Sequence, residues 1–386
     1  LHPVAHSFPT RRSSDLQPMK KTAYVGIDYH VKQITIAVMV EDENTFLETI
    51  HLINKDKMIK QYLQKLSKQY ELKICYEASS SGYNFQRKLH KWGYHCDVIA
   101  PSLVPKQPGN RRKNDFRDAR NLTEHYKGGR LTIVHPPTQQ EEAVRSLVRC
   151  RLSFKKDEKN TKLQINSLLL SQGHHWKKSK WTRQHRQWIH QISFVEQYLQ
   201  QVLLEYLAHL EHLETCIARL DAQIEQIANS ETYAPSVKKL RALKGMGTLS
   251  AMILIAEVTD FRRFANPKAL MAFLGLIPSE NSSSDIQRGG SITKTGNKRC
   301  RTQLIESVRH YIKKPRMSAQ MKADCALISA DCVNVVQECM RRLHKRYWSL
   351  VMKGKHHNLA LTAIAREFVG FIWVLMTKDN TAAQAA

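Results

Sequence analysis

The chain has 386 residues, 60 of them lysine or arginine and 34 aspartate or glutamate, which gives a formal net charge of +26 and an isoelectric point of about 9.8. Soluble metabolic enzymes are commonly neutral or mildly acidic, so this charge argues against that class and predicts a polyanionic partner, with nucleic acid the leading candidate. The length allows two or three domains, and the longest apolar runs fall short of the roughly 20 residues of a membrane span, so no transmembrane segment is expected.

The first residues need separate treatment. The stretch HSFPTRRSSDL, residues 6–16, resembles the translation of a sequencing-adapter oligonucleotide. We therefore interpret residues 1–18 as a non-native leader and exclude them from fold reasoning, as one would a tag. The natural start is expected at Met19.

Residues 19–137 are predicted to form a mixed α/β domain. Alternating apolar and polar residues predict strands, helical periodicity predicts the segments between them, and two consecutive prolines mark the end of the domain. The expected strands cover 22–30, 33–40, about 45–52, 72–78 and 95–101, the expected helices cover about 55–69, 82–92 and 114–127, and 128–137 closes the domain.

Residues 138–232 have helical patterning throughout. Six apolar residues alternate spacings of three and four, the pattern of a coiled-coil seam, which fits either a dimer contact or a helical hairpin within one chain. The tryptophans beside the basic run of this segment either stack on bases or anchor helices. The seam residues are Leu210, Leu213, Ile217, Leu220, Ile224 and Ile227, and the tryptophans are Trp176, Trp181 and Trp188.

Between residues 151 and 190 there are ten lysines and arginines against two acids. A soluble surface normally mixes charges of both signs, so this run predicts nucleic-acid binding, with a solvated helix face as the alternative. The candidate contacts are Lys155, Lys156, Lys159 and Lys162.

Residues 233–386 are expected to be mostly helical, with a serine- and glycine-rich loop at 275–296. Its composition is that of a solvated loop, but the neighbouring cations suit phosphate groups, and we assign that role to Arg288, Lys294 and Arg301. A turn at Lys244, Gly245 and Gly247 either offers backbone N–H groups to a phosphate or joins two helices. Both interpretations stay open.

Four carboxylates stand out in the α/β domain. Asp28 and Glu77 are acids in strand-like surroundings, and Asp115 and Asp118 lie one turn apart at the start of a helix. Each has a bland alternative, such as a turn residue or ordinary charge at a helix start. Gathered in one cleft they would repel one another unless a cation neutralised them, and a pair of Mg²⁺ ions prefers such oxygen ligands. We therefore predict a metal-dependent phosphoryl-transfer site.

Three motifs resemble, in order and spacing, those of the DEDD transposases of bacterial insertion sequences, the insertion-sequence 110 group. They are YVGIDYH, CYEASSSGY and NDFRDARNL, and the resemblance continues through ALKGMGTLSAMILIAEV, FANPKALMAFLGLIPSE and ITKTGNKRCR to the C-terminal ALTAIAREFVGFIW. It implies a RuvC-like, ribonuclease-H-like first domain and a serine-bearing transposase domain in the helical region 233–386; the helical pattern of 138–232 predicts a coiled-coil segment between them.

The resemblance also implies functional residues. Asp28, Glu77, Asp115 and Asp118 would bind the metals, and a serine five positions after Pro278 would be the nucleophile. That count gives Ser283; because Ser284 stands where the family usually has glycine, Ser282 and Ser284 stay open. The family further implies a composite site formed by the two halves, a structured guide or bridge RNA, and a homodimer or tetramer.

We therefore expect a cytoplasmic, nucleoid-associated bacterial DNA transposase or recombinase. It would excise and insert a mobile element by Mg²⁺-assisted phosphoryl transfer with a serine nucleophile. The first alternative is a Holliday-junction nuclease in which the carboxylates hydrolyse DNA and the serine loop only binds it. The second is a non-catalytic nucleic-acid-binding remnant.

Overall fold

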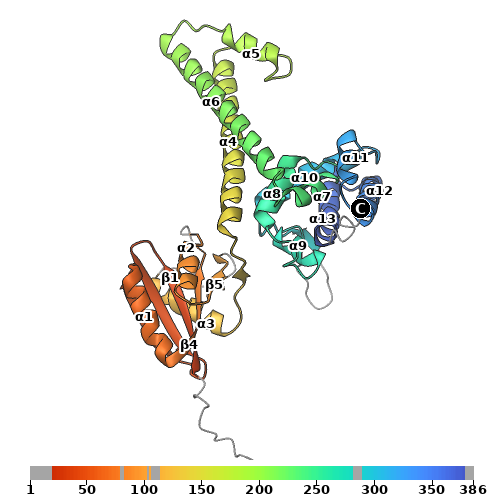
Figure 1. Cartoon of the computed structure of the whole chain (residues 1–386). Helices are drawn as coiled ribbons and strands as arrows, with labels where there is room; N and C mark the ends of the chain where they lie inside the picture. Colours follow the sequence, from red (N-terminus) through yellow and green to blue (C-terminus); the bar gives the residue numbers. More distant parts are fainter. Residues whose placement is uncertain (1–19, 79–81, 102–103, 106–113, 281–288, 379–386) are drawn as a thin grey trace, which may run out of the picture. The chain divides into compact units, whose positions relative to one another are not determined.

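The structure is a computed structural model in which contacts divide the chain into two compact units (Figure 1). Leu1–Pro136 is the N-terminal unit and Pro137–Ala386 the C-terminal unit. The first is mixed α/β and the second mainly helical, which confirms the predicted fold class. The expected leader, 1–18, lies outside the described residues. The structure describes residues 20–78, 82–101, 104–105, 114–280 and 289–378.

A six-stranded sheet of order β3-β2-β1-β4-β5-β6 forms the centre of the N-terminal unit. Strand β1 is antiparallel to β2 and parallel to β4, and β4 is parallel to β5. The alternation that predicted these strands is therefore confirmed by their hydrogen-bond pairing. The strands are β1 Lys21–Tyr29, β2 Gln33–Val40, β3 Phe46–Ile53, β4 Tyr70–Glu77, β5 Cys96–Ile99 and β6 Ile133–Val134.

Helices cover both faces of this sheet. On one face, α1 (Asp56–Gln69) and α2 (Asn84–Lys91) pack against the alternate strand residues, including Val25 and Ile27. On the other face, α3 (Asp115–Lys127) covers β1, β2 and β4. Because successive side chains of a strand point to opposite faces, residues 26 and 28 of β1 face α3.

The C-terminal unit contains a long helical hairpin made by α4 (Gln139–Ser171) and α6 (Gln197–Ala228). Arg151 pairs with Asp221 and Lys162 with Glu214, so the two helices run antiparallel. Of the two interpretations of the apolar seam, the structure therefore shows the hairpin within one chain. Four seam residues are buried in it, namely Leu210, Leu213, Ile217 and Ile224.

The far end of this hairpin is closed by α5 (Arg183–His190) and a cluster of aromatic rings. His185 is only 1% exposed, its Nδ1 accepts a hydrogen bond from the backbone N–H of Trp181 at 2.8 Å, and its ring stacks on Trp188 at 5.6 Å. Trp176 packs on both His185 and Trp188. The three tryptophans thus anchor the helices, one of the two roles that the sequence suggested.

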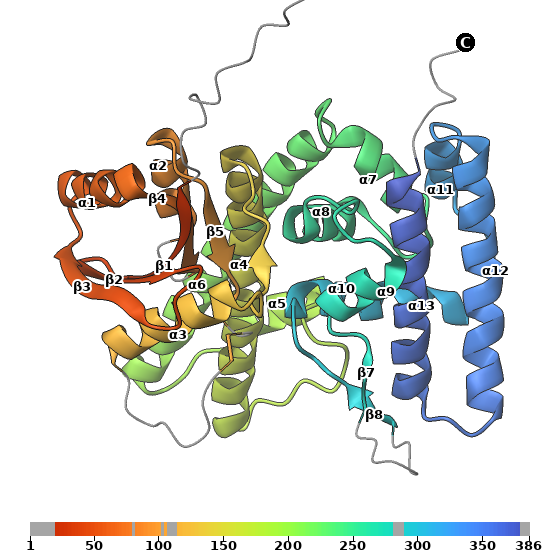
Figure 2. The ribbon, with the colours of Figure 1, turned by 90° about the horizontal axis from the view of Figure 1, so that it is seen from below.

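The remaining helices pack around one apolar core (Figure 2). Helix α8 is buried along most of its length and α13 is packed against α9, α10 and α12. Helix α13 has the length and composition of a membrane span, but most of its apolar residues belong to this core. The elements are α7 Ala234–Arg241, α8 Thr248–Val258, α9 Pro267–Phe273, β7 Pro278–Glu280, β8 Gly289–Ile292, α10 Lys298–Val308, η2 Arg309–Ile312, α11 Ala319–Cys325, α12 Ala330–Met352 and α13 His357–Thr377.

Candidate active site

Two of the predicted carboxylates come at the same edge of the sheet. The parallel pairing of β1 with β4 places Ile27 beside Tyr76, so Asp28 and Glu77 follow at the carboxyl ends of neighbouring strands. Ligand sites of α/β sheets lie at this edge. Asp28 is partly buried, with 17% of its side chain exposed.

The other two acids lie on α3, and the absence of a side chain at Gly26 lets this helix pack close to β1. A Cβ added at Gly26 would lie 2.3 Å from Oγ1 of Thr123 and 3.0 Å from the carbonyl oxygen of Ala119. Helix α3 therefore rests directly on the backbone of β1. Residues 115, 119 and 123 share one helical face, so contact at Ala119 and Thr123 carries Asp115 towards Asp28.

The local sequence starts α3 where the site needs it. Asn114 caps the helix, since its Oδ1 accepts a hydrogen bond from the N–H of Phe116 at 3.0 Å. Asp115 and Asp118 then stand in the first turn, where the helix dipole favours their ionised forms. Asp118 is close enough to raise the pKa of Asp28.

His30 completes the cluster and was missed in the sequence analysis. Its Nε2 lies 3.3 Å from Oδ2 of Asp28 and 3.9 Å from Oδ1 of Asp115. One ligand atom from each of these three residues lies within 4.8 Å of the other two. The spacing was a usable signal: residues 28 and 30 are two apart on an extended chain and so point to the same face.

The electrostatics of the cluster suit a cation. Burial raises the pKa of Asp28, His30 lowers it, and Asp115 and Asp118 raise it again, with a net upward shift. Burial and the neighbouring Asp115 and Asp118 thus disfavour the ionised form of Asp28, and a bound cation would favour it again. Carboxylate oxygens with one imidazole nitrogen form a donor set that binds divalent ions, so these residues fit the divalent metal that a DEDD site implies.

The serine loop is described only at its stem. Ser282, Ser283, Ser284 and Arg288 lie outside the described residues. Strands β7 and β8 pair antiparallel, and Oγ of Ser279 donates a hydrogen bond to the carbonyl of Ser291 at 2.9 Å. The stem thus emerges from the C-terminal unit as a defined two-stranded ribbon.

Arg301 lies beneath this stem. It is 8% exposed, and its Nη1 donates to the carbonyls of Leu274 at 3.0 Å and Thr295 at 3.3 Å. A Cβ on Gly275, whose φ is +66°, would lie 1.9 Å from the carbonyl oxygen of Thr295, so only glycine fits there. Lys294 is exposed beside them, and its backbone N–H donates to the carbonyl of Gly275.

Asn297 links the stem to α4. It caps α10 through Oδ1 and donates from Nδ2 to Oε2 of Glu257 at 2.6 Å. Glu257 is buried and also receives two hydrogen bonds of 2.7 Å from Arg149 on α4. Burial raises the pKa of Glu257, but Arg149, Asn297 and Arg299 outweigh it and lower the pKa overall.

The glycine turn joins α7 to α8 and packs on α10. Gly245 has φ of +81°, and a Cβ there would lie 2.2 Å from the carbonyl oxygen of Ser307. Nζ of Lys244 donates to the carbonyls of Lys313 and Lys314. Gly247 immediately precedes α8, and a Cβ there would meet nothing within 4 Å. In this structure Lys244 therefore makes hydrogen bonds within the protein and Gly245 packs against α10, whereas no atom of the described residues lies close to the Cα of Gly247 on its side-chain face.

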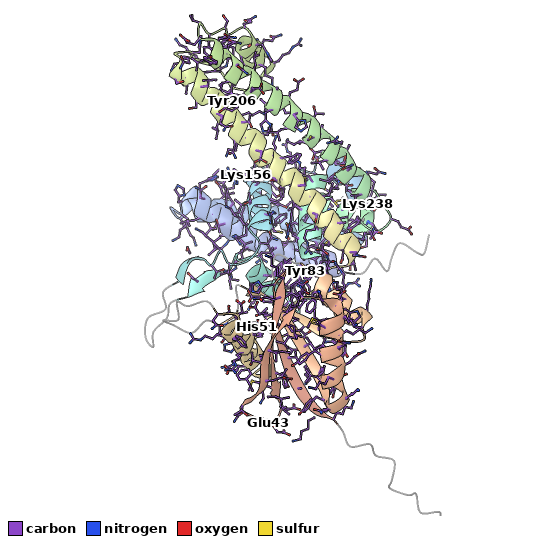
Figure 3. All side chains as sticks on the ribbon, turned by 90° about the vertical axis from the view of Figure 1, so that its left-hand side faces the viewer. Glu43, His51, Tyr83, Lys156, Tyr206 and Lys238 are labelled. Carbon is purple, nitrogen blue, oxygen red and sulfur yellow. The ribbon has the colours of Figure 1, made fainter. Side chains whose placement is uncertain are left out.

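The predicted basic contacts on α4 divide into two kinds. Lys155 and Lys162 both pair with the buried Glu158, and Lys162 also lies 3.2 Å from Glu214. Lys156 and Lys159 are exposed, and no ion pair joins either of them to a residue that the structure describes. Figure 3 labels Lys156 on α4.

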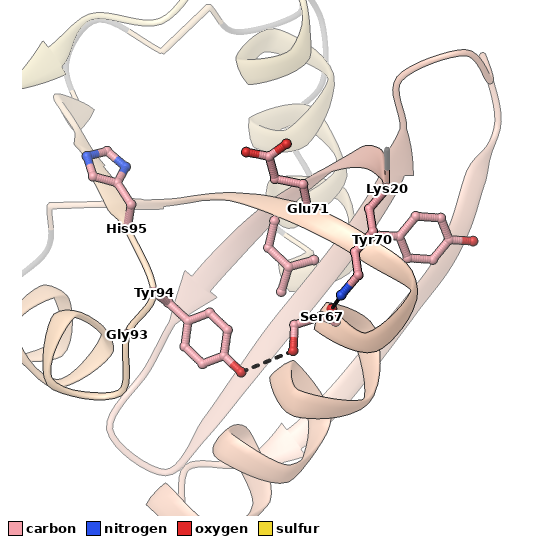
Figure 4. Close-up of a pocket in the computed structure, with 8 residues that line it drawn as sticks. Lys20, Ser67, Tyr70, Glu71, Gly93, Tyr94 and His95 are labelled. Atoms are coloured by element: carbon pink, nitrogen blue, oxygen red, sulfur yellow. Dashed lines mark hydrogen bonds between the residues drawn. The ribbon is translucent and has the colours of Figure 1, made fainter. Parts of the chain in front are cut away.

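A separate hollow of about 410 Å³ lies at the opposite edge of the sheet from Asp28 (Figure 4). Nζ of Lys20 donates to the carbonyl of Ser67 at 2.7 Å, and the Ser67 and Tyr94 hydroxyls are 3.4 Å apart. The hollow flanks the amino ends of β1, β4 and β5, away from the edge where ligands of such sheets bind. The predicted acids contribute nothing to it; its lining is Lys20, Ser67, Tyr70, Glu71, Leu72, Gly93, Tyr94 and His95.

Comparison with known proteins gives consistent matches to both units. Residues 25–173 match a transposase family model named for the DEDD domain of IS110, and residues 237–322 match the model described as Transposase IS116/IS110/IS902 family. The chain is 32% identical to the putative transposase y4qE of Sinorhizobium fredii (strain NBRC 101917 / NGR234) over 92% of this chain and 88% of that protein. It is 30% identical to the transposase for insertion sequence element IS1533 of Leptospira borgpetersenii over 66% of this chain and 75% of that protein.

Proposed function

The chain belongs to the IS116/IS110/IS902 family of transposases, and we propose that it excises and inserts its mobile DNA element with a serine nucleophile and Mg²⁺. The observation that carries the metal part is the convergence of Asp28, His30 and Asp115 at one edge of the sheet. Two bound Mg²⁺ ions would polarise the phosphodiester and favour attack on phosphorus. Asp28, Glu77, Asp115 and Asp118 are the residues that we assign to hold them.

We assign the nucleophile to Ser283, in the loop that β7 and β8 support. Its Oγ would form a bond to phosphorus while the bond from phosphorus to the leaving deoxyribose oxygen breaks, giving a phosphoserine link. The hydroxyl proton passes to one of the clustered carboxylates. The proposal requires the serine and the carboxylates to act on one phosphodiester, within one chain or between the copies of a dimer or tetramer.

The basic surface supports a nucleic-acid partner beyond one short DNA site. Lys156 and Lys159 are exposed on α4, and the whole chain carries +26. We propose that a structured guide RNA pairs with the DNA and that the protein contacts backbone phosphates. Phosphate contacts would then position the complex, and base pairing would select the sequence.

Formation of a covalent adduct tests the serine chemistry. The protein is copurified with RNA transcribed from the flank of the element and mixed with labelled donor-junction DNA and Mg²⁺. We expect a denaturant-stable protein–DNA adduct that Ser283→Ala and Asp28→Ala each abolish, while Ser282→Ala and Ser284→Ala retain it. Cleavage without an adduct, unaffected by all three serine variants but lost with Asp28→Ala, would instead establish the hydrolytic nuclease.

A further inference from the structure

His30 stands where a metal ligand would stand, although the sequence analysis assigned the site to carboxylates alone. In octahedral coordination, ligands bound at about 2.1 Å lie about 3.0 Å apart when adjacent and about 4.2 Å apart when opposite. The 3.3 Å and 3.9 Å separations of its Nε2 from Asp28 and Asp115 fall between these values. The three atoms can therefore reach one ion with small movements.

The backbone around His30 is held from two sides. Its N–H donates to the carbonyl of Gln33 at 3.1 Å, and its own carbonyl accepts from Nδ2 of Asn54 at 2.8 Å. These contacts fix the turn between β1 and β2 and leave the ring directed at the two acids. The ring is 42% exposed and the next residue, Val31, is 83% exposed, so packing in a core does not account for this placement.

We propose that Nε2 of His30 is a direct ligand of a divalent ion at this site, together with Asp28 and Asp115. The inference deepens the proposed function and rests on its metal dependence. Mg²⁺ takes oxygen ligands almost exclusively, whereas first-row transition ions accept imidazole nitrogen together with carboxylates. The nitrogen gives this position a preference for Mn²⁺ over Mg²⁺.

A histidine ligand also changes the charge balance of the site. Two carboxylates and one neutral imidazole carry a charge of −2, which one divalent ion neutralises. Asp118 and Glu77 then remain for a second ion at the same edge. A neutral imidazole in the position of a further carboxylate thus adds no negative charge beside Asp28.

The test is the electron-spin-echo spectrum of Mn²⁺ bound to the full-length protein, without DNA or RNA. We expect modulation from a directly bound ¹⁴N nucleus in the wild type, lost in His30→Gln, whose side chain can supply oxygen. His51→Gln is the matched control. His51 lies on β3, next to β2, where its ring contacts Phe116 and its Nδ1 is hydrogen-bonded to the hydroxyl of Thr35. This variant should retain the nitrogen signal.

Metal titration gives a second readout. His30→Gln should weaken Mn²⁺ binding at least about tenfold, because the loss of a residue that only hydrogen-bonds to a metal ligand already costs that much. Mg²⁺ affinity should change much less. A wild-type spectrum without ¹⁴N modulation, or modulation that survives in His30→Gln, would overturn the inference. Equal losses of Mn²⁺ and Mg²⁺ affinity would overturn the preference.

The two proposals fail separately. A serine–DNA adduct formed by a protein whose Mn²⁺ shows only oxygen ligands would refute the role of His30 and leave the proposed function intact. A ¹⁴N signal that depends on His30, in a protein that forms no adduct, would do the reverse.

Discussion

Thr123 packs on the backbone of Gly26 so closely that a Cβ at Gly26 would come within 2.3 Å of its Oγ1. That hydroxyl also donates to the carbonyls of Ala119 and Ala37, so it fastens α3 to the sheet. The contact lies two residues from Asp28 along β1 and two helical turns from Asp115 along α3. It therefore sets the distance between two of the acids.

Gly26→Ala should consequently disturb the metal site. The added methyl group meets backbone atoms of α3 as well as Oγ1, so the helix must move, at a cost of about 2 kcal/mol in the free energy of unfolding. We expect weaker Mn²⁺ binding as well as a lower unfolding midpoint. Calorimetric titration and urea unfolding measure the two effects.

The control is Gly128→Ala at the other end of α3, where an added Cβ meets mainly the mobile side chain of Arg130. It should change the free energy of unfolding by less than about 0.5 kcal/mol and leave metal affinity unchanged. Normal Mn²⁺ affinity in Gly26→Ala would show that close packing at Gly26 does not set the geometry of the acids.

Glu257 should make the C-terminal unit sensitive to acid. The pKa of Glu257 is lowered in the folded state because Arg149, Asn297 and Arg299 outweigh the effect of burial. A lowered pKa gives stability that is complete above the unfolded value of about 4.5 and is lost as pH falls through the folded value. Glu257→Gln should cost about 2 kcal/mol near pH 7, a figure reduced for the partial exposure of Arg149.

Urea unfolding between pH 7 and pH 3 measures this difference. The wild type should lose its advantage over Glu257→Gln below about pH 4.5, so the two stability curves converge. Glu338→Gln is the control, because Glu338 pairs with Arg341 on the exposed side of α12. Curves that stay parallel for wild type and Glu257→Gln would mean that Glu257 does not carry this linkage.

Much of the N-terminal unit was predictable because its signals are local. Strand β4 alternates apolar and polar residues, β2 is a mainly apolar run that is buried on both faces, and the Asn114 cap with Asp115 marks the start of α3. The grouping of Asp28 with Asp115 was first a hypothesis from residue type and charge, and the resemblance then supported it, although the two are far apart in the chain. No local pattern indicated that the missing side chain of Gly26 makes room for α3. This contact depends on how β1 and α3 pack, which neither segment shows by itself.

Charge was harder to interpret than pattern. Lys162 and Arg186 looked available for nucleic acid, but both pair with Glu214 on α6. The acid that neutralises Arg186 lies 28 residues away, so composition within 151–190 could not reveal it. Helix boundaries limit local patterns in the same way. Cys325, Cys332 and Cys339 recur every seven residues, the spacing of one helix face, yet Cys325 ends α11 and the other two lie on α12.

His185 should make the end of the helical hairpin loosen in mild acid. Burial lowers the pKa of His185, and the charges of Lys180 and Arg186 lower it further. For this lowered pKa, stability is complete above the unfolded value of about 6.5 and is lost as pH falls through the folded value. Protonation would also remove the acceptor that Nδ1 offers to the N–H of Trp181.

Tryptophan fluorescence follows this change, because Trp176 and Trp188 pack on the same ring. Between pH 7 and pH 5 the emission should shift to longer wavelength as the indoles become hydrated. His185→Gln keeps an acceptor without the titration and should abolish the shift, whereas His190→Gln, on the exposed side of α5, should retain it. A shift that persists in His185→Gln would assign it to another group.

Variants of Arg301 and of the exposed lysines of α4 should differ in how strongly their DNA affinity depends on salt concentration. Each phosphate contact contributes about 0.9 to the slope of log affinity against log salt concentration, so Lys156→Met and Lys159→Met should each lower that slope by about 1. Arg301→Met should leave the slope unchanged, because Nη1 is engaged by two carbonyls beneath the β7–β8 stem. It should instead destabilise the C-terminal unit by about 2 kcal/mol, the cost of hydrogen bonds to a charged group. DNA binding from 50 to 300 mM salt, together with urea unfolding, measures both; a slope lowered by Arg301→Met at unchanged stability would restore its predicted role as a phosphate contact.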